Sequence, residues 1–302
     1  MDESVGEAVV GGPESAGARP ARSRWLSDGA GRLALSVVVD GRANAADAAQ
    51  VARLIGKLQL AGVWWRQPPV TGSPASNVAG LLDLLWTSAA PAIAGLIAAG
   101  SDVSPDLIDR LQGPVDGGEP AVRLAVCDPV SLSAEFMRTL ADHRHGMRVA
   151  LARPSGPDAL PGAATAIFVP IAADRDLGAS VAAAAAVAAG RPVLVEVAVS
   201  VGRTNAEASA RTVGEELFTV IGHPVEQGLF GTLEECQANA AVLAQMGASE
   251  LVCHLPRSPD LPDVLAQLRA ISIGASLLRP GEPASSPPPP PVGWGGRQTS
   301  PS

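Results

Sequence analysis

The chain has 302 residues, of which 47% are hydrophobic and 17% are charged, and its formal net charge is −8. This apolar content excludes a wholly disordered chain, and the absence of a basic stripe argues against binding to nucleic acid. The only cysteines, Cys127, Cys236 and Cys253, are too sparse to staple a small fold, which favours a reducing compartment.

Two sequence features bear on location. Gly, Pro or polar residues break every apolar run before the ~18 positions that a membrane-spanning helix needs. The N-terminus, residues 1–4, is acidic and lacks the basic and apolar regions of a secretory signal. We therefore expect a cytoplasmic protein without a membrane segment.

The two ends differ in composition from the middle. Residues 1–31 are rich in Gly, Ala, Ser, Pro and Glu without an apolar period, and the C-terminal stretch carries an unbroken proline run at 287–291. Such segments favour disorder or polyproline II geometry. The expected organisation is a disordered segment at 1–31, one folded domain at 32–279 and a disordered, proline-rich tail at 280–302.

Within 32–279, short apolar runs alternate with longer segments whose apolar residues recur every three to four positions. In chain order, the short runs predict buried strands at 33–39, 62–65, 91–97, 121–126, 148–152, 166–171, 192–201 and 250–254. The longer segments predict helices at 45–60, 76–86, 105–111, 133–143, 157–163 and 176–189. Three more helices are predicted: one that begins after Thr204, one from Thr232 to 246, and one at 260–271.

Local signals mark several helix ends. Ser104 precedes a proline at a first helical position and is a predicted N-cap. Thr204 with Glu207, and Thr232 with Glu235, have the spacing of capping boxes. A glycine at position 247 is the predicted C-cap of the helix that begins at Thr232.

Eight strands, each followed by a helix, over about 250 residues are the pattern of a (β/α)8 TIM barrel. A doubly wound open sheet is the competing architecture, and it usually has fewer strands and a glycine-rich first turn. The turn at 40–44 has a single glycine and no G-x-G-x-x-G motif. The sequence therefore favours the barrel.

The active site of such a barrel lies at the carboxyl ends of its strands. His254 ends the last predicted strand, where it is either an acid, base or hydrogen-bond donor, or a structural histidine. Ser155 and Gly156 form a turn before Pro157 at a predicted helix start. This turn either offers backbone N–H groups to a phosphate or is an ordinary loop.

The sequence offers three further candidates for chemistry: carboxylates at strand ends, a metal site and a Schiff-base lysine. Asp40 and Asp128 each follow a strand, either as carboxylates for acid–base work or as helix caps. No His, Cys, Asp or Glu group has the spacing of metal ligands. Lys57 is the only lysine and falls on a predicted helix, which excludes a strand-borne Schiff base.

Several segments together resemble a known family. Residues 191–208, RPVLVEVAVSVGRTNAEA, followed by 229–255, LFGTLEECQANAAVLAQMGASELVCHL, resemble the C-terminal part of luciferase-like, flavin- or coenzyme F420-dependent oxidoreductases. Residues 149–171 are similar to the phosphate-loop segment of that family and the strand after it. The resemblance implies a (β/α)8 barrel that binds FMN or F420 at its mouth, with Ser155, Gly156 and Pro157 at the cofactor phosphate.

The same resemblance also shows departures. Family members often carry an acidic residue and one or two histidines just after the second strand, where this chain has Gln67 followed by Pro68 and Pro69. We expect Gln67 and His254 to be the catalytic residues of an oxidoreductase or monooxygenase that acts on a small organic substrate. The alternative is a catalytically degenerate barrel that serves as a cofactor-binding or partner subunit. The expected partner is a second copy or a related barrel.

Overall fold

The computed structural model describes residues 33–40, 45–58, 60–66, 93–105, 107–108, 122–128, 137–138, 147–152, 164–172, 176–213, 215, 228–256 and 261–277. The predicted ends at 1–31 and 280–302 lie outside these ranges, as do the helices expected at 76–86 and 157–163 and most of those at 133–143 and 105–111. Four candidate site residues also lie outside them: Gln67, Ser155, Gly156 and Pro157.

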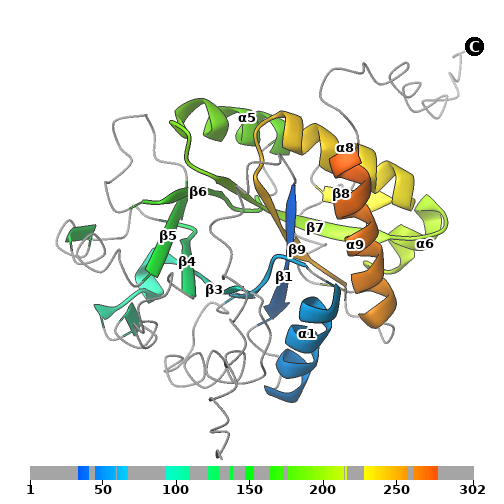
Figure 1. The fold of residues 1–302 in the computed structure, drawn as a ribbon, viewed down its shortest axis with the longest axis horizontal. Helices are drawn as coiled ribbons and strands as arrows, with labels where there is room; N and C mark the ends of the chain where they lie inside the picture. Colours follow the sequence, from blue (N-terminus) through cyan, green and yellow to red (C-terminus); the bar gives the residue numbers. More distant parts are fainter. Residues whose placement is uncertain are drawn as a thin grey trace, which may run out of the picture.

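Eight parallel strands close into a barrel, as the sequence predicted (Figure 1). They are β1 (Ala34–Asp40), β2 (Gly62–Arg66), β3 (Ile93–Ala98), β4 (Val122–Val126), β5 (Met147–Ala152), β6 (Ala166–Val169), β7 (Val193–Val201) and β9 (Glu250–His254). Each strand pairs with the next along the chain as far as β7. β9 then pairs with both β7 and β1 and closes the ring.

The prediction missed one further strand. β8 (Gly228–Gly231) pairs in parallel with the last four residues of β7, beyond the stretch of β7 that pairs with β6. It has only four residues, and the glycines at both of its ends are typical of a turn. β8 extends the sheet at the carboxyl end of β7 without joining the closed ring.

The helices cover the outside of the barrel (Figure 1). They are α1 (Ala45–Leu58), α5 (Leu177–Val187), α6 (Asn205–Ala210), α8 (Leu233–Gln245) and α9 (Leu261–Leu277). α9 extends six residues past its predicted end and packs against α8 and α1. No helix in the described ranges is long and apolar enough to cross a membrane.

Side chains alternate between two cores along each strand. On β7, Val195, Val197 and Val199 belong to the core between strands and helices, whereas Leu194 belongs to the core inside the barrel. This period of two is the geometry of a β-strand. It also places Glu196 on the inner face of β7, beside Leu194.

The lower half of the barrel interior, toward the amino ends of the strands, contains a buried polar network. The carboxylate of Glu250, at the start of β9, accepts hydrogen bonds from the Ser36 hydroxyl, from the Trp64 indole N–H at 3.0 Å and from Arg123 Nη1 at 2.5 Å. The Arg123 guanidinium stacks on the Trp64 ring at 4.6 Å from its centroid. These contacts connect strands β1, β2, β4 and β9.

The helix caps follow the sequence with one correction. Thr232 and Glu235 form the predicted capping box, and the Ser104 hydroxyl accepts the N–H of Leu107 as an N-cap. At Thr204 only half of the predicted box forms. The Thr204 hydroxyl accepts the N–H of Glu207, but the Glu207 carboxylate accepts the N–H of Arg203 instead.

Candidate active site

A fully buried carboxylate, that of Glu196, organises the polar groups at the carboxyl end of the barrel. One of its oxygens accepts hydrogen bonds from Arg66 Nη1 and from His254 Nε2, the latter at 2.6 Å. Its other oxygen accepts the backbone N–H of Ile171 at 3.0 Å. We call Arg66, Glu196 and His254 the mouth cluster.

Three different strands position the mouth cluster. Arg66 is the last residue of β2, and His254 is the last residue of β9. Because all these strands are parallel, their carboxyl ends meet at one end of the barrel, which is where barrel enzymes hold their active sites. His254 is 8% exposed and Arg66 about one third, so the cluster lies at the boundary between the interior and solvent.

The inward direction of these side chains follows from strand alternation. On β9, Val252 belongs to the inner core and Cys253 to the outer one, so His254 faces inward. The same alternation places Arg66 on the inner face, because Trp64 lies inside the barrel and Trp65 outside. Cys253 and His254 therefore point to opposite sides of the strand, as neighbours on a β-strand do.

Cys127 lies beside the mouth cluster, just after β4. It is partly buried and packs against the inner apolar core. Burial raises the pKa of this thiol, while the nearby positive charge of Arg66 lowers it. A thiol that keeps its proton at neutral pH is a weak nucleophile, so the acid–base groups of the site are the carboxylate and the imidazole.

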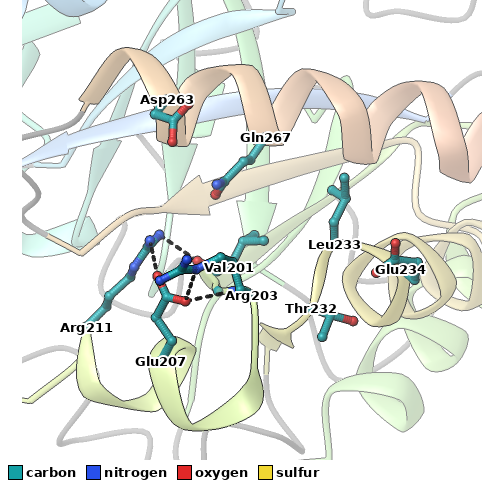
Figure 2. A pocket seen from close by; sticks show the side chains of 10 residues that line it. Val201, Arg203, Glu207, Arg211, Thr232, Leu233, Glu234, Asp263 and Gln267 are labelled. Atoms are coloured by element: carbon teal, nitrogen blue, oxygen red, sulfur yellow. Dashed lines mark hydrogen bonds and ion pairs between the residues drawn. The ribbon is translucent and has the colours of Figure 1, made fainter.

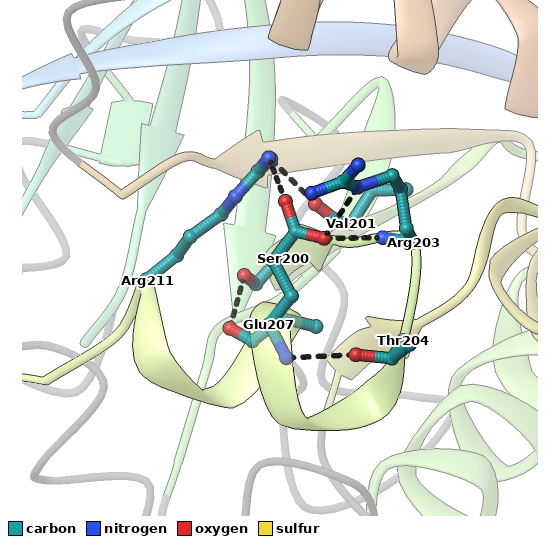
Figure 3. Close-up of polar contacts among 7 residues, drawn as sticks. Ser200, Val201, Arg203, Thr204, Glu207 and Arg211 are labelled. Atoms are coloured by element: carbon teal, nitrogen blue, oxygen red, sulfur yellow. Dashed lines mark hydrogen bonds and ion pairs between the residues drawn. The ribbon is translucent and has the colours of Figure 1, made fainter.

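A hollow lies outside the ring of strands, between α6, the start of α8 and α9 (Figure 2). Its volume is about 490 Å³, and its lining includes Arg203, Glu207 and Arg211. Figure 3 shows that both arginines converge on the Glu207 carboxylate. Hydrogen bonds from Arg203, through its backbone N–H first, lower the pKa of Glu207. This hollow is therefore bordered by charges that largely neutralise one another.

The structure places one predicted catalytic residue at the site. His254 lies in the barrel mouth with a buried carboxylate as its partner. The catalytic role predicted for Gln67, and the phosphate-binding role predicted for Ser155, Gly156 and Pro157, stay predictions because these residues lie outside the described ranges.

Sequence reasoning missed Glu196, although one signal for it was present. Glu196 is the only charged residue in VLVEVAVSV, a strand that is buried along its whole length. A charge buried in an apolar strand needs a partner, so this position could have been singled out. Within the described ranges, no three His, Cys, Asp or Glu side chains gather as metal ligands.

Comparisons with known proteins bear on the fold. No family model matches this chain, and no curated protein matches it either. Similar solved structures do exist. One is an F420-dependent secondary alcohol dehydrogenase in complex with an F420–acetone adduct, with a TM-score of 0.60 and 11% identity, over 81% of this chain and 99% of that one.

Two further structures extend the same likeness. The coenzyme F420-dependent tetrahydromethanopterin reductase of Methanopyrus kandleri has a TM-score of 0.58 and 11% identity, over 79% of this chain and 97% of that one. A monooxygenase from Streptomyces bottropensis has a TM-score of 0.53 and 11% identity, over 80% of this chain and 98% of that one. At these identities the likeness establishes a shared barrel fold.

Proposed function

We propose that this chain is an oxidoreductase that binds a flavin or the deazaflavin F420 at the barrel mouth and acts on a small organic substrate. The observation that carries the proposal is the mouth cluster, in which a buried carboxylate holds a histidine at the carboxyl end of a TIM barrel. Barrels of the same fold include an F420-dependent alcohol dehydrogenase, an F420-dependent reductase and a monooxygenase.

The chemistry of the described residues fits such a cofactor. A flavin or deazaflavin ring has flat, apolar faces and a polar edge. The upper part of the barrel offers an apolar cluster of Ala198, Phe230 and Ile171, and Ile171 donates its N–H to the carboxylate that holds His254. Ser155 and Gly156 would hold the cofactor phosphate through their backbone N–H groups, with Pro157 beside them.

The proposed role of His254 is to move a proton. A bound cofactor of this type supplies hydride transfer or oxygen activation, and oxidation of an alcohol also releases a proton that a base must accept. Glu196 orients the imidazole through Nε2 and stabilises its protonated form. The backbone N–H of Ile171 and the guanidinium of Arg66 hold that carboxylate in place.

The first test is a binding titration. The purified protein is titrated separately with FMN and with F420, and cofactor fluorescence is followed. We expect saturable binding of one of the two at micromolar concentration. If neither cofactor binds at tens of micromolar, the proposal is wrong.

The second test addresses His254. His254→Gln should retain cofactor binding and lower turnover of the best alcohol, aldehyde or ketone substrate by about 10²–10⁴-fold, the usual contribution of a general acid or base. Cys253→Ala is the matched control, because Cys253 is the neighbouring residue and faces the outer core. Cofactor binding without turnover of any substrate would favour the non-catalytic barrel instead, acting as a partner subunit for a second copy or a related barrel.

A further inference from the structure

Arg66 spans the barrel mouth. It leaves the end of β2 and reaches Glu196 on β7, although β1 and β9 lie between these two strands in the ring. Its charge also acts on the thiol of Cys127, at the end of β4. The guanidinium therefore lies near the carboxyl ends of β2 and β4 and reaches the middle of β7, above the inner apolar core.

Arg66 has donor capacity beyond the bond to Glu196. A guanidinium carries five N–H groups in a rigid, planar fork. Within the described part of the chain, Arg66 donates to Glu196 through Nη1, and its side chain is 34% exposed while that of Glu196 is wholly buried. One edge of the guanidinium thus contacts the interior, and the rest of the side chain is partly open to solvent.

Glu196 makes this arrangement rigid. Its carboxylate accepts from Arg66, His254 and the backbone of Ile171, which are contributed by different parts of the ring. A guanidinium held in this way loses little conformational freedom when it binds a ligand. The mouth cluster therefore holds a pre-oriented cation beside a histidine.

We infer that Arg66 anchors the carboxylate of a small organic acid that binds in the barrel mouth. The planar fork of a guanidinium matches the two oxygens of a carboxylate. A single guanidinium fork is enough to bind one carboxylate in this bidentate way. The packed inner core below, which includes Phe168 and Ile97, makes the floor beneath Arg66 apolar.

This inference rests on the proposed function in one respect, since it names the substrate class for the same site. The substrate would be a carboxylic acid whose alcohol, carbonyl or apolar part faces the cofactor. The carboxylate would bind Arg66, and the reacting part would lie nearer His254. Binding of the acid to the protein needs no cofactor, so the inference can be tested separately.

The test is isothermal titration of the full chain with acetate, butanoate, hexanoate and benzoate, each beside its primary amide. We expect at least one carboxylate to bind at least tenfold more tightly than its amide. Arg66→Met, which keeps an unbranched apolar stem and removes the charge, should weaken binding of that carboxylate about 10–100-fold, the effect of losing a charge-assisted hydrogen bond. It should leave the amide unchanged.

Two controls keep this result interpretable. Arg53→Met changes the net charge equally, but Arg53 is exposed on α1, and its loss should not change the affinity. Arg66→Met leaves the buried Glu196 with one partner fewer, so the double variant Arg66→Met/Glu196→Gln removes both charges and protects against misfolding. Cooperative unfolding and circular dichroism check that each variant is folded, and the double variant should also lose the carboxylate preference.

A second readout uses Cys127 and requires no variant. Because Cys127 lies near Arg66, a carboxylate bound there should slow alkylation of this thiol by iodoacetamide at least threefold at saturation. The matched amide should give no protection. Unchanged alkylation under saturating carboxylate would contradict the placement of the anion beside Arg66.

The outcomes separate the two proposals. If no carboxylate is preferred to its amide, or if inorganic phosphate binds while all the carboxylates do not, the inference about Arg66 is wrong, whatever the cofactor titrations give. If a carboxylate binds through Arg66 but neither FMN nor F420 binds, the proposed oxidoreductase function fails and the anion site stands.

Discussion

At the scale of single residues, the central feature is a glutamate in the middle of an apolar strand. Burying an isolated carboxylate is costly, and Glu196 is stabilised only because a guanidinium, an imidazole and a backbone N–H converge on it. Removal of any of these partners leaves a buried charge with less compensation. The candidate chemistry of the protein thus depends on a side chain that is itself inaccessible to solvent.

The cysteines make a prediction about alkaline pH. Burial raises the pKa of Cys236 to about 12, and burial raises the pKa of Cys253 as well. In the unfolded chain both thiols lose their protons near the ordinary value of about 9, so from there upward the native state holds more protons and its free energy of unfolding falls. We expect the melting temperature to decrease between pH 8 and pH 10.5.

Cys253→Ala tests the cause of this decrease. The variant loses some packing at all pH values, but its melting temperature should fall less steeply between pH 8 and pH 10.5 than that of the wild type. Equal slopes would show that other groups cause the alkaline loss.

Gly95 gives a second prediction at this scale. A Cβ at this position would overlap the Trp64 ring, with Cδ2 and Cζ3 only 2.7 Å away. Trp64 is fully buried and donates a hydrogen bond to Glu250, so its ring has little room to move. Gly95→Ala should lower the free energy of unfolding by about 1–3 kcal/mol, as at other overpacked sites. A urea titration of the variant and the wild type measures this difference.

Gly178→Ala is the matched control. A Cβ there would meet the flexible end of Met246 at 3.2 Å, and alanine favours the helix α5. We expect no loss of stability from this variant. A result in which both alanines cost the same would mean that the Trp64 ring is not the constraint.

At the scale of elements, local sequence signals decide where helices begin. α8 starts at a capping box in which the Thr232 hydroxyl accepts the N–H of Glu235, and the Glu235 carboxylate accepts the N–H of Thr232 at 2.8 Å. At Thr204 the corresponding carboxylate, that of Glu207, accepts the backbone N–H of Arg203 instead. The same motif therefore forms completely at Thr232 and only partly at Thr204, where the Glu207 carboxylate also binds the side chains of Arg203 and Arg211.

Thr232→Ala should lower the free energy of unfolding by about 1 kcal/mol, because α8 then starts without its side-chain cap. Thr232→Ser retains the hydroxyl and should restore most of this loss. Denaturant titration of the wild type and the two variants measures these free energies of unfolding. If serine and alanine were equally destabilising, the threonine methyl group and not the cap would be the cause.

The capping box also affects stability in acid. The backbone N–H of Thr232 lowers the pKa of Glu235. The ionised carboxylate therefore stabilises the fold at pH values above the ordinary pKa of glutamate, and this stabilisation is lost as the pH falls through the lowered pKa. Glu235→Gln should flatten the acid side of the stability curve between pH 5 and pH 3. Glu234→Gln, one residue earlier and exposed, should leave the curve unchanged.

At the scale of the whole molecule, the barrel holds two layers of polar groups on its inner faces. The lower layer centres on Glu250 and connects β1, β2, β4 and β9, and the upper layer is the mouth cluster. The lower layer is closed to solvent, with Arg123 and Glu250 at most 2% exposed. The upper layer is open at Arg66. This difference separates a layer that supports the barrel from one that can meet a ligand.

The lower layer predicts a non-additive double mutant. Arg123→Met leaves the Glu250 carboxylate buried with its charge uncompensated and should cost about 3–5 kcal/mol. Adding Glu250→Gln removes that charge and should recover a substantial part of the loss. Unfolding free energies of the four proteins in the cycle measure the coupling, and simple additivity would contradict a direct role for the pair.

The sequence by itself determined the architecture of this protein. Strand alternation, helix periodicity and capping signals are local, so they predicted each strand of the closed ring within two residues at either end and favoured a barrel over an open sheet. The short strand β8 escaped because four residues with two glycines carry too weak a pattern.

Only the tertiary structure decided which polar residues meet. His254 was a candidate because it ends a strand, but its partner Glu196 lies 58 positions away, and Arg66 lies a further 130 positions from that carboxylate. No local pattern encodes such a contact, because it depends on ring closure and on how far each side chain reaches across the barrel. The scaffold is therefore readable from local periodicity, whereas the site exists only once the ring has closed.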